Sequence, residues 1–220
     1  MNFNSQQIID QMTQSGMISV FNHQDILVAQ KVLDVAYHAG VRVFEFTNRE
    51  FNAFEVFKEL KLYAEKYPDL LLGIGTIFTA EDAQKFHLIG ADFIVSPALI
   101  PEVAQYCQMK GIFWIPGCAT VTEVYAAKSL GASLIKAFPG NLLGPAFIKA
   151  VLSVIPDVKM MPTGGVEPNH QNLKAWFDAG VSCVGMGSQL FDKKAIENGD
   201  FSVLEARIKE SLNIIQSFKK

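Results

Sequence analysis

The stretch Val41-Arg42-Val43-Phe44-Glu45-Phe46-Thr47 has the pattern of a strand that is buried on both faces. Alternation along a strand places Glu45 and Thr47 on one face. Phe44 and Phe46 then share the other face, where two large rings suit a layer packed beneath helices. Glu45 is therefore expected to point into the interior of a barrel.

Short apolar runs of this kind alternate with longer segments of helical period along the chain. The expected strands cover residues 18–21, 41–47, 70–76, 93–97, 113–117, 134–139, 159–163 and 183–187. The expected helices cover residues 24–39, 53–66, 80–89, 101–109, 121–130, 145–154, 169–179 and 201–218. Several helices end at a glycine, such as Gly40 and Gly131, and two begin at threonine caps, Thr79 and Thr120.

Eight such strand–helix units predict an α/β fold, a (β/α)8 TIM barrel, with residues 1–220 forming a single domain. A doubly wound open sheet is the main alternative. It is disfavoured because no Gly-x-Gly-x-x-Gly motif follows the first expected strand. Active sites of barrels of this type lie at the carboxyl ends of the strands, and the polar residues of this chain gather there.

Composition excludes several function classes. The 220 residues are 50% hydrophobic and carry a formal net charge of −3, so we expect no nucleic-acid or membrane partner. Three widely spaced cysteines form no Cys-x-x-Cys pair and suggest reduced thiols in a cytoplasmic protein. The first residues have no signal-peptide pattern. The four histidines have no ligand spacing, so no metal site is expected.

Lys136 lies in Ala132-Ser133-Leu134-Ile135-Lys136-Ala137-Phe138-Pro139-Gly140, which otherwise resembles a buried strand. Burial lowers the pKa of an unpaired ammonium, and a lysine that is neutral near pH 7 can form a Schiff base with a ketone. The alternative is a strand that ends early and lets the amine reach solvent. Alternation sends Lys136 inward together with Leu134 and Phe138.

Glu45 and Lys136 are thus expected to share the mouth of the barrel. One interpretation is a buried salt bridge that only stabilises the fold. The other is catalytic: Lys136 is the Schiff-base amine, and Glu45 transfers protons to and from the carbinolamine, the α-carbon and the aldol hydroxyl.

Other strand ends could bind an anionic substrate. Arg49 could hold the carboxylate of a 2-keto acid in a bidentate pair, and Thr76 could add a hydrogen bond, although a surface arginine and a turn threonine are the plain alternatives. The last two strands end in Pro162-Thr163-Gly164-Gly165-Val166 and Gly185-Met186-Gly187-Ser188. Their glycines and Ser188 lie where barrels of this type commonly bind phosphate. The segment from Gly140 to Pro145 is either a mobile loop or a helix entry.

The order and spacing of several motifs resemble those of the 2-keto-3-deoxy-6-phosphogluconate (KDPG) aldolase family, which includes the 4-hydroxy-2-oxoglutarate aldolases. The motifs are Glu45-Phe46-Thr47-Asn48-Arg49, Gly73-Ile74-Gly75-Thr76, Ser96-Pro97, Ile115-Pro116-Gly117, Ile135-Lys136-Ala137-Phe138-Pro139 and Pro162-Thr163-Gly164-Gly165. The resemblance runs from about Ile18 to Phe191. It implies a metal-independent class I aldolase on a (β/α)8 barrel, with no cofactor and usually as a homotrimer.

The resemblance also implies roles for individual residues. Lys136 matches the Schiff-base lysine and Glu45 the general acid/base. The pyruvate carboxylate would be bound by Arg49 and Thr76. Pro97 and Phe138 match the pocket walls near pyruvate, and Gly164, Gly165 and Ser188 match the phosphate-binding positions. Thr163 and Gly187 lie beside these positions and complete the expected substrate-binding set.

Some positions point to different members of the family. Gly117-Cys118-Ala119-Thr120 and the segment 144–150 look like phosphogalactonate-type aldolases, whereas Arg49 and Thr163 look like the phosphogluconate type. Gly140-Asn141 replaces the more usual small or acidic residues in a loop expected to meet the sugar hydroxyls. The C4 configuration of the preferred substrate is therefore left open.

The leading hypothesis is reversible cleavage of a 2-keto-3-deoxy-6-phospho sugar acid to pyruvate and glyceraldehyde 3-phosphate. A nearer alternative is cleavage of unphosphorylated 4-hydroxy-2-oxoglutarate to pyruvate and glyoxylate. A phosphate-binding barrel isomerase or synthase would use Lys136 as a charge clamp. A catalytically idle relative that senses a sugar acid is the last alternative, and the lysine–glutamate pair disfavours it.

Overall fold

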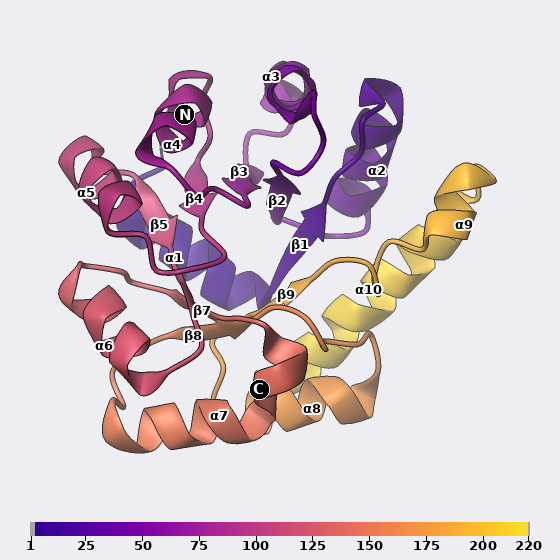
Figure 1. Cartoon of the computed structure of the whole chain (residues 1–220). Helices are drawn as coiled ribbons and strands as arrows, with labels where there is room; N and C mark the ends of the chain where they lie inside the picture. The colour runs from indigo at the N-terminus through magenta and orange to yellow at the C-terminus, as the bar shows by residue number, and fades with distance from the viewer. Residues whose placement is uncertain (1–2, 220) are drawn as a thin grey trace.

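Short strands line the middle of the molecule and helices surround them in the computed structural model, which describes residues 3–219 (Figure 1). The strands are β1 (Met17–Phe21), β2 (Val43–Thr47), β3 (Leu71–Gly75), β4 (Phe93–Val95), β5 (Phe113–Ile115), β6 (Gly117–Cys118), β7 (Ile135–Ala137), β8 (Met160–Pro162) and β9 (Val184–Met186). The helices are α1 (Ser5–Ser15), α2 (Ile26–His38), α3 (Ala53–Tyr63), α4 (Ala80–Leu88), α5 (Pro101–Lys110), α6 (Val121–Ser129), α7 (Gly140–Val154), α8 (His170–Asp178), α9 (Lys193–Glu197) and α10 (Phe201–Ser217), with a 3-10 turn η1 (Ala64–Lys66).

The strands form two parallel sheets. One has six strands in the order β5-β4-β3-β2-β1-β9, and the other has three in the order β6-β7-β8. A bridge between Thr163 and Gly185 joins the end of β8 to β9. The molecule is thus an α/β fold with a curled parallel sheet, which is a coarser description than the eight strands of one closed barrel that the sequence predicted.

The expected strand at residues 113–117 is divided in the structure, and Pro116 is the reason. Proline has no N–H group to donate to a neighbouring strand, so the ladder is interrupted between β5 and β6. The Pro116 carbonyl still accepts a hydrogen bond from the backbone N–H of Lys136, at 2.8 Å. The interruption therefore lies directly beside the lysine strand.

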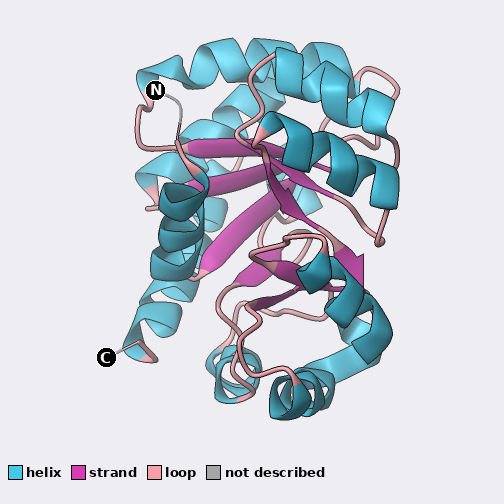
Figure 2. Cartoon of the chain, turned by 90° about the vertical axis from the view of Figure 1, so that its left-hand side faces the viewer, coloured by secondary structure: helices cyan, strands magenta, loops and turns pink. Residues whose placement is uncertain are grey.

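Buried apolar side chains form two clusters, one on each face of the strands. Phe44 and Phe46 belong to the cluster between strands and helices, as predicted from alternation. The second cluster fills the interior and contains Ile8, Ile9, Met12, Ile18, Val43, Leu71, Phe93, Val95, Phe113, Ile115, Leu134, Met161 and Cys183. Viewed from the side, helices cover the outside of the strands (Figure 2).

Helix α1 was not predicted from the sequence, and it supplies part of the interior. Asn4 caps it in a reciprocal pair with Gln7, and Gly16 ends it in the left-handed conformation. Its residues Ile8, Ile9 and Met12 pack into the interior cluster. In Figure 1 this helix crosses behind the strands. The interior is therefore filled with apolar side chains on the side where the chain begins.

The remaining helix ends follow the expected chemistry. The Thr79 and Thr120 hydroxyls accept hydrogen bonds from the backbone N–H groups of Asp82 and Glu123, which confirms the predicted caps.

Within residues 3–219, no helix has the length and apolar content needed to cross a bilayer.

Candidate active site

Glu45 and Lys136 face each other in the interior, as predicted. Glu45 is on β2, beside Gly73 of β3, and Lys136 is on β7, between Gly117 and Met161. The Lys136 Nζ atom is 4.0 Å from the Glu45 Oε1 atom. The two residues are 4% and 0% exposed, so neither charge is solvated by bulk water.

Burial shifts the protonation of both groups toward neutrality. It lowers the pKa of Lys136, the Arg49 charge lowers it further, and the Glu45 carboxylate opposes the shift. Burial likewise raises the pKa of Glu45 against the opposing charges of Lys136 and Arg49. A neutral amine is a nucleophile, and a carboxyl with a raised pKa can both accept and donate a proton near pH 7. The pair has the properties that Schiff-base chemistry requires.

Several oxygen atoms around the pair are buried without a hydrogen-bond partner among the described residues. They include both carboxylate oxygens of Glu45 and the hydroxyl oxygens of Thr47 and Thr163. A buried polar atom left in this way costs about 1–3 kcal/mol. Such a cluster is typical of a binding site in which a polar ligand supplies the missing hydrogen-bond partners.

Glycines create the space that these groups occupy. A Cβ atom added at Gly75 would collide with the Glu45 carboxylate, and one added at Gly185 would collide with the Thr163 hydroxyl. At Gly117 it would meet the Pro97 carbonyl carbon and oxygen. The sequence placed Gly185 in an expected phosphate-binding segment and gave Gly75 and Gly117 no separate role, and the structure gives each of the three a steric reason.

Thr76, the expected carboxylate ligand, directly follows β3 and has an unusual backbone. Its φ is 64°, a left-handed conformation that is an outlier for a β-branched residue. Such conformations persist where the surrounding structure enforces them, often at functional sites. Pro97 lies half-buried beyond β4. Its neighbour Ser96 instead accepts a hydrogen bond from the Trp114 indole at 3.0 Å and is fully buried on the side of the helices.

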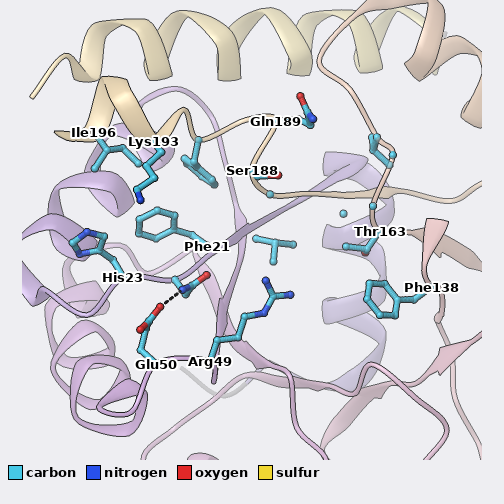
Figure 3. A pocket seen from close by; sticks show the side chains of 18 of the residues that line it. Phe21, His23, Arg49, Glu50, Phe138, Thr163, Ser188, Gln189, Lys193 and Ile196 are labelled. Carbon is cyan, nitrogen blue, oxygen red and sulfur yellow. Dashed lines mark hydrogen bonds between the residues drawn. The ribbon is translucent and has the colours of Figure 1, made fainter. Parts of the chain in front are cut away.

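An open pocket of about 700 Å³ lies at the strand ends and is bordered by Arg49, Phe138 and Thr163 (Figure 3). Its lining contains Val20, Phe21, Asn22, His23, Gln24, Arg49, Glu50, Phe138, Thr163, Gly164, Gly165, Val166, Gly185, Gly187, Ser188, Gln189, Phe191, Lys193, Ile196 and Glu197. Four expected site residues are not part of this lining: Glu45, Thr76, Pro97 and Lys136. Phe138 connects the two regions, because its ring centroid is 4.9 Å from the Lys136 Nζ atom.

The Arg49 side chain points into this pocket (Figure 3). The Gly164-Gly165 turn lies against the start of α7. Both glycines have positive φ, 89° and 70°, and a Cβ atom at Gly165 would lie 2.8 Å from the Asn141 Cα atom. Only glycine fits at this position. Because glycine has no side chain, the backbone of the turn itself borders the pocket. The structure therefore brings Arg49, the glycine turn and Ser188 around one cavity, as expected.

The segment from Gly140 to Pro145 is a helix entry. Residues from Gly140 onward are helical, but Gly144 leaves the helical conformation with φ 66° and ψ 172°. Pro145 then begins the second part of α7, where its missing N–H has no helical partner to lose. The helix expected over residues 145–154 is confirmed, whereas the short helical turn before it was not predicted.

Several pocket residues were missed by the sequence reasoning. The Asn22 amide donates a hydrogen bond to the Glu50 Oε1 atom at 2.9 Å and joins the loops after β1 and β2. Lys193 and Glu197 come from α9, a helix of five residues. Such a short helix has no readable period, and the only sequence signal was its aspartate cap, Asp192.

The three cysteines are free and buried, and burial raises the pKa of each thiol to about 12. They are therefore poor nucleophiles near neutral pH. Within residues 3–219, no group of three or more His, Cys, Asp or Glu side chains is placed to hold a metal ion.

Comparison with known proteins gives consistent matches. Residues 8–207 match the protein family described as KDPG and KHG aldolase. The 2-dehydro-3-deoxy-phosphogluconate aldolase of Treponema pallidum is 34% identical over 177 residues, covering 80% of this chain and 82% of the relative. The 2-dehydro-3-deoxy-6-phosphogalactonate aldolase of Escherichia coli is 38% identical over 122 residues, covering 55% and 58%.

A solved structure of a KDPG aldolase from Legionella pneumophila superposes with a TM-score of 0.83. It is 28% identical, and the match covers 92% of this chain and 97% of that one. That protein holds pyruvate captured at low pH as a covalent carbinolamine intermediate.

Proposed function

Because the chain belongs to the KDPG and KHG aldolase family, we propose that it is a class I aldolase that reversibly cleaves 2-dehydro-3-deoxy-6-phosphogluconate, or its galactonate epimer, to pyruvate and D-glyceraldehyde 3-phosphate. The observation that carries the mechanism is the buried Lys136–Glu45 pair. Both groups are shifted by burial toward the protonation states that the chemistry needs.

The reaction begins when the neutral Lys136 amine attacks the C2 ketone. The carbinolamine loses water and becomes an iminium. Glu45 takes the proton of the C4 hydroxyl, the electron pair of that O–H bond forms the C=O bond of the aldehyde, and the C3–C4 bond breaks. Its electron pair passes to the iminium nitrogen and gives an enamine. The proton on Glu45 returns to C3, and water hydrolyses the iminium to release pyruvate and the free lysine.

The other site residues hold the two ends of the substrate. Arg49 and Thr76 bind the carboxylate of the keto acid, which keeps C2 within reach of Lys136. Pro97 and Phe138 form walls beside the pyruvate half. This arrangement is supported by the Arg49 side chain, which points into the pocket (Figure 3), and by the position of Phe138 beside the lysine.

The phosphate end lies along the last two strand ends. Gly164, Gly165 and Gly187 let backbone N–H groups approach the phosphate, and Ser188 adds a hydroxyl donor. Thr163 contributes its hydroxyl between this end and the reacting carbons. Support comes from the positive φ values of Gly164 and Gly165 and from the place of all these residues in the pocket lining.

The assembly belongs to the same proposal. The Thr163–Gly185 bridge and the near-continuity of β5 and β6 support a single-domain, eight-stranded (β/α)8 barrel. We expect a cytoplasmic homotrimer without a metal or other cofactor. Large apolar side chains are exposed just after three strands, Phe51 at 91% and Phe78 at 52% on loops and Leu142 at 78% in the first turn of α7, and they support burial between subunits. Light scattering after size exclusion tests this, and a monomer would contradict it.

A second candidate is a 4-hydroxy-2-oxoglutarate aldolase, which the family description includes. It uses the same amine and carboxylate and releases glyoxylate in place of the phosphorylated aldehyde. The ratio of kcat/KM for the two substrates separates the candidates. Ser188→Ala should reduce activity toward the phosphorylated substrate only.

The direct test is incubation with pyruvate, reduction with borohydride and peptide mass mapping. A reduced pyruvate adduct on Lys136 supports the class I mechanism. Absence of an adduct, in a protein shown to be folded, contradicts it and favours a phosphate-binding barrel isomerase or synthase. Pyruvate bound without either adduct or turnover would indicate a sensor of sugar acids.

A further inference from the structure

The pocket extends beyond the positions assigned to the substrate. Its far end is formed by α9, the end of β1 and the loop that follows it, where Phe21, His23, Lys193 and Ile196 lie (Figure 3). The Lys193 side chain projects from α9 toward Phe21 and His23, so its amine lies over this end of the cavity (Figure 3). The chemistry assigned so far uses none of these residues.

The pocket lining carries too little positive charge to neutralise the proposed anionic substrate. Among the described lining residues, the fixed cations are Arg49 and Lys193, and the carboxylates are Glu50 and Glu197. The substrate brings one carboxylate and a phosphate of charge about −2 at pH 7. This step rests on the proposed function: Arg49 is taken by the keto-acid carboxylate. Lys193 is then the remaining fixed cation that can neutralise the phosphate.

Lys193 is free to bind the phosphate because the ion pair that it forms with Glu197 is weak. Its Nζ atom is 3.6 Å from the Glu197 Oε1 atom, and the two side chains are 89% and 59% exposed. Exposed pairs of this kind contribute little, since water and salt screen them. A phosphate dianion held by neutral backbone N–H groups would compete for the amine more strongly than one carboxylate does.

The lysine backbone is held in place relative to the phosphate end. The backbone N–H groups of Leu190 and Phe191 donate to the Gly187 carbonyl at 2.8 and 3.1 Å. Asp192 then caps α9 by accepting from the Ala195 N–H at 2.8 Å. These bonds tie α9 to the strand end that carries Ser188. The long side chain of Lys193 is the mobile part, and its stem lets the amine reach along the cavity.

We propose that Lys193 is a specificity-determining residue that favours phosphorylated aldehyde substrates by extending its amine from α9 across the pocket toward a phosphate held at the glycine turn and Ser188. It touches the end of the substrate that does not react. Its contribution should therefore lower KM with little effect on kcat. A charge at the rim should also speed substrate capture, so the preference should weaken as ionic strength rises.

The test compares Lys193→Met with Lys194→Met. Lys194 is the neighbouring exposed lysine of α9 and is not part of the pocket lining, so it controls for net charge. We expect Lys193→Met to reduce kcat/KM for the phosphorylated substrate about ten- to a hundredfold, through KM. Activity toward 4-hydroxy-2-oxoglutarate and the yield of pyruvate adduct on Lys136 should not change. Equal losses on both substrates, or none, would overturn the proposal.

A second readout does not depend on turnover. Titration calorimetry with inorganic phosphate measures the anion site directly in the folded wild type and both variants. Weaker phosphate binding in Lys193→Met alone supports the assignment, even if the pyruvate adduct on Lys136 fails to form and the aldolase proposal falls. Equal phosphate affinity in the two variants overturns it, even if the aldolase reaction is established.

Discussion

Gly75 faces the carboxylate of Glu45 so closely that any side chain at this position would collide with the Glu45 Oε1 atom. The two residues lie on neighbouring strands, β3 and β2, and both point into the interior. The acid/base group thus owes its position to a missing Cβ atom on the next strand. This relationship makes the glycine a part of the catalytic geometry.

Gly75→Ala should displace the Glu45 carboxylate and destabilise the fold by about 1–3 kcal/mol, the usual cost of overpacking a core. The free energy of unfolding in urea measures this. The control is a double-mutant cycle with Glu45→Ala, which empties the space. In that background Gly75→Ala should cost much less, and an equal cost in both backgrounds would mean that the collision is relieved in another way.

Glu45→Gln should reduce kcat by about 10²–10⁴, because the amide cannot exchange protons with the substrate. KM should change less than kcat, since other residues bind the carboxylate and phosphate ends in the proposed complex. Steady-state kinetics on the phosphorylated substrate measure both parameters. An unchanged kcat with a raised KM would contradict the acid/base role.

Lys136→Met should abolish turnover and the pyruvate adduct while the circular dichroism spectrum stays that of the wild type. It should also change the dependence of stability on pH. Burial raises the pKa of Glu45, and a carboxyl whose folded pKa lies above its unfolded value weakens the fold as pH rises from the unfolded toward the folded pKa. Lys136 opposes this shift, so its loss should make stability fall more steeply on raising the pH from about 5 to about 8.

The double variant Lys136→Met/Glu45→Gln is the matched control for this pH effect, because it has no titrating group at either position. Urea unfolding across the same pH range should show no such steep fall. If the single and double variants lose stability in parallel, Glu45 is not the group responsible.

Arg49→Gln should move the acidic limb of the kcat/KM profile to higher pH. Burial is the main cause of the lowered pKa of Lys136, and the positive charge of Arg49 adds to it. Without that charge the lysine keeps its proton more tightly, so the neutral amine appears at higher pH. The level of activity will also drop through weaker carboxylate binding, but only the shift of the limb tests the electrostatic argument. A limb at the wild-type pH would contradict it.

Thr47→Val should leave stability unchanged or raise it, since the valine removes a buried hydroxyl that has no partner among the described residues. Thr47 lies on β2 between Glu45 and Arg49, on the face that points inward. We therefore expect kcat to fall, and Thr47→Ser to restore it. A drop in stability without a change in kcat would assign the hydroxyl a structural role.

The sequence was sufficient for those parts of the molecule where a repeating pattern exists. Alternation placed Glu45 inside and Phe44 and Phe46 outside, and both placements are confirmed. Each expected strand and helix is present within a few residues of its predicted bounds, apart from the division of one strand at Pro116. These features depend on local periodicity, which a single sequence displays.

Features that depend on contacts between distant segments were not predictable in the same way. Helix α1 has an ordinary amphipathic sequence, and only packing shows that Ile8 and Met12 fill the interior. Lys193 lies on a helix too short to have a period. Ser96 is next to the expected site residue Pro97 in sequence, yet its hydroxyl accepts a hydrogen bond from the Trp114 indole on the side of the helices. Pairings of this kind are set by the fold as a whole.

The apolar packing of α1 has a consequence for the order of chemical events. Ile8, Ile9 and Met12 fill the interior on the side of α1, and the pocket lies at the strand ends on the other side, so among the described residues it is the pocket that leads toward the proposed reacting carbons. In the proposed reaction the aldehyde half lies in that pocket, above the covalently held three-carbon fragment. In the cleavage direction the aldehyde must therefore depart first, and in synthesis pyruvate must enter first. A shared route to solvent therefore makes the order of product release fixed. Product-inhibition kinetics should show an ordered mechanism.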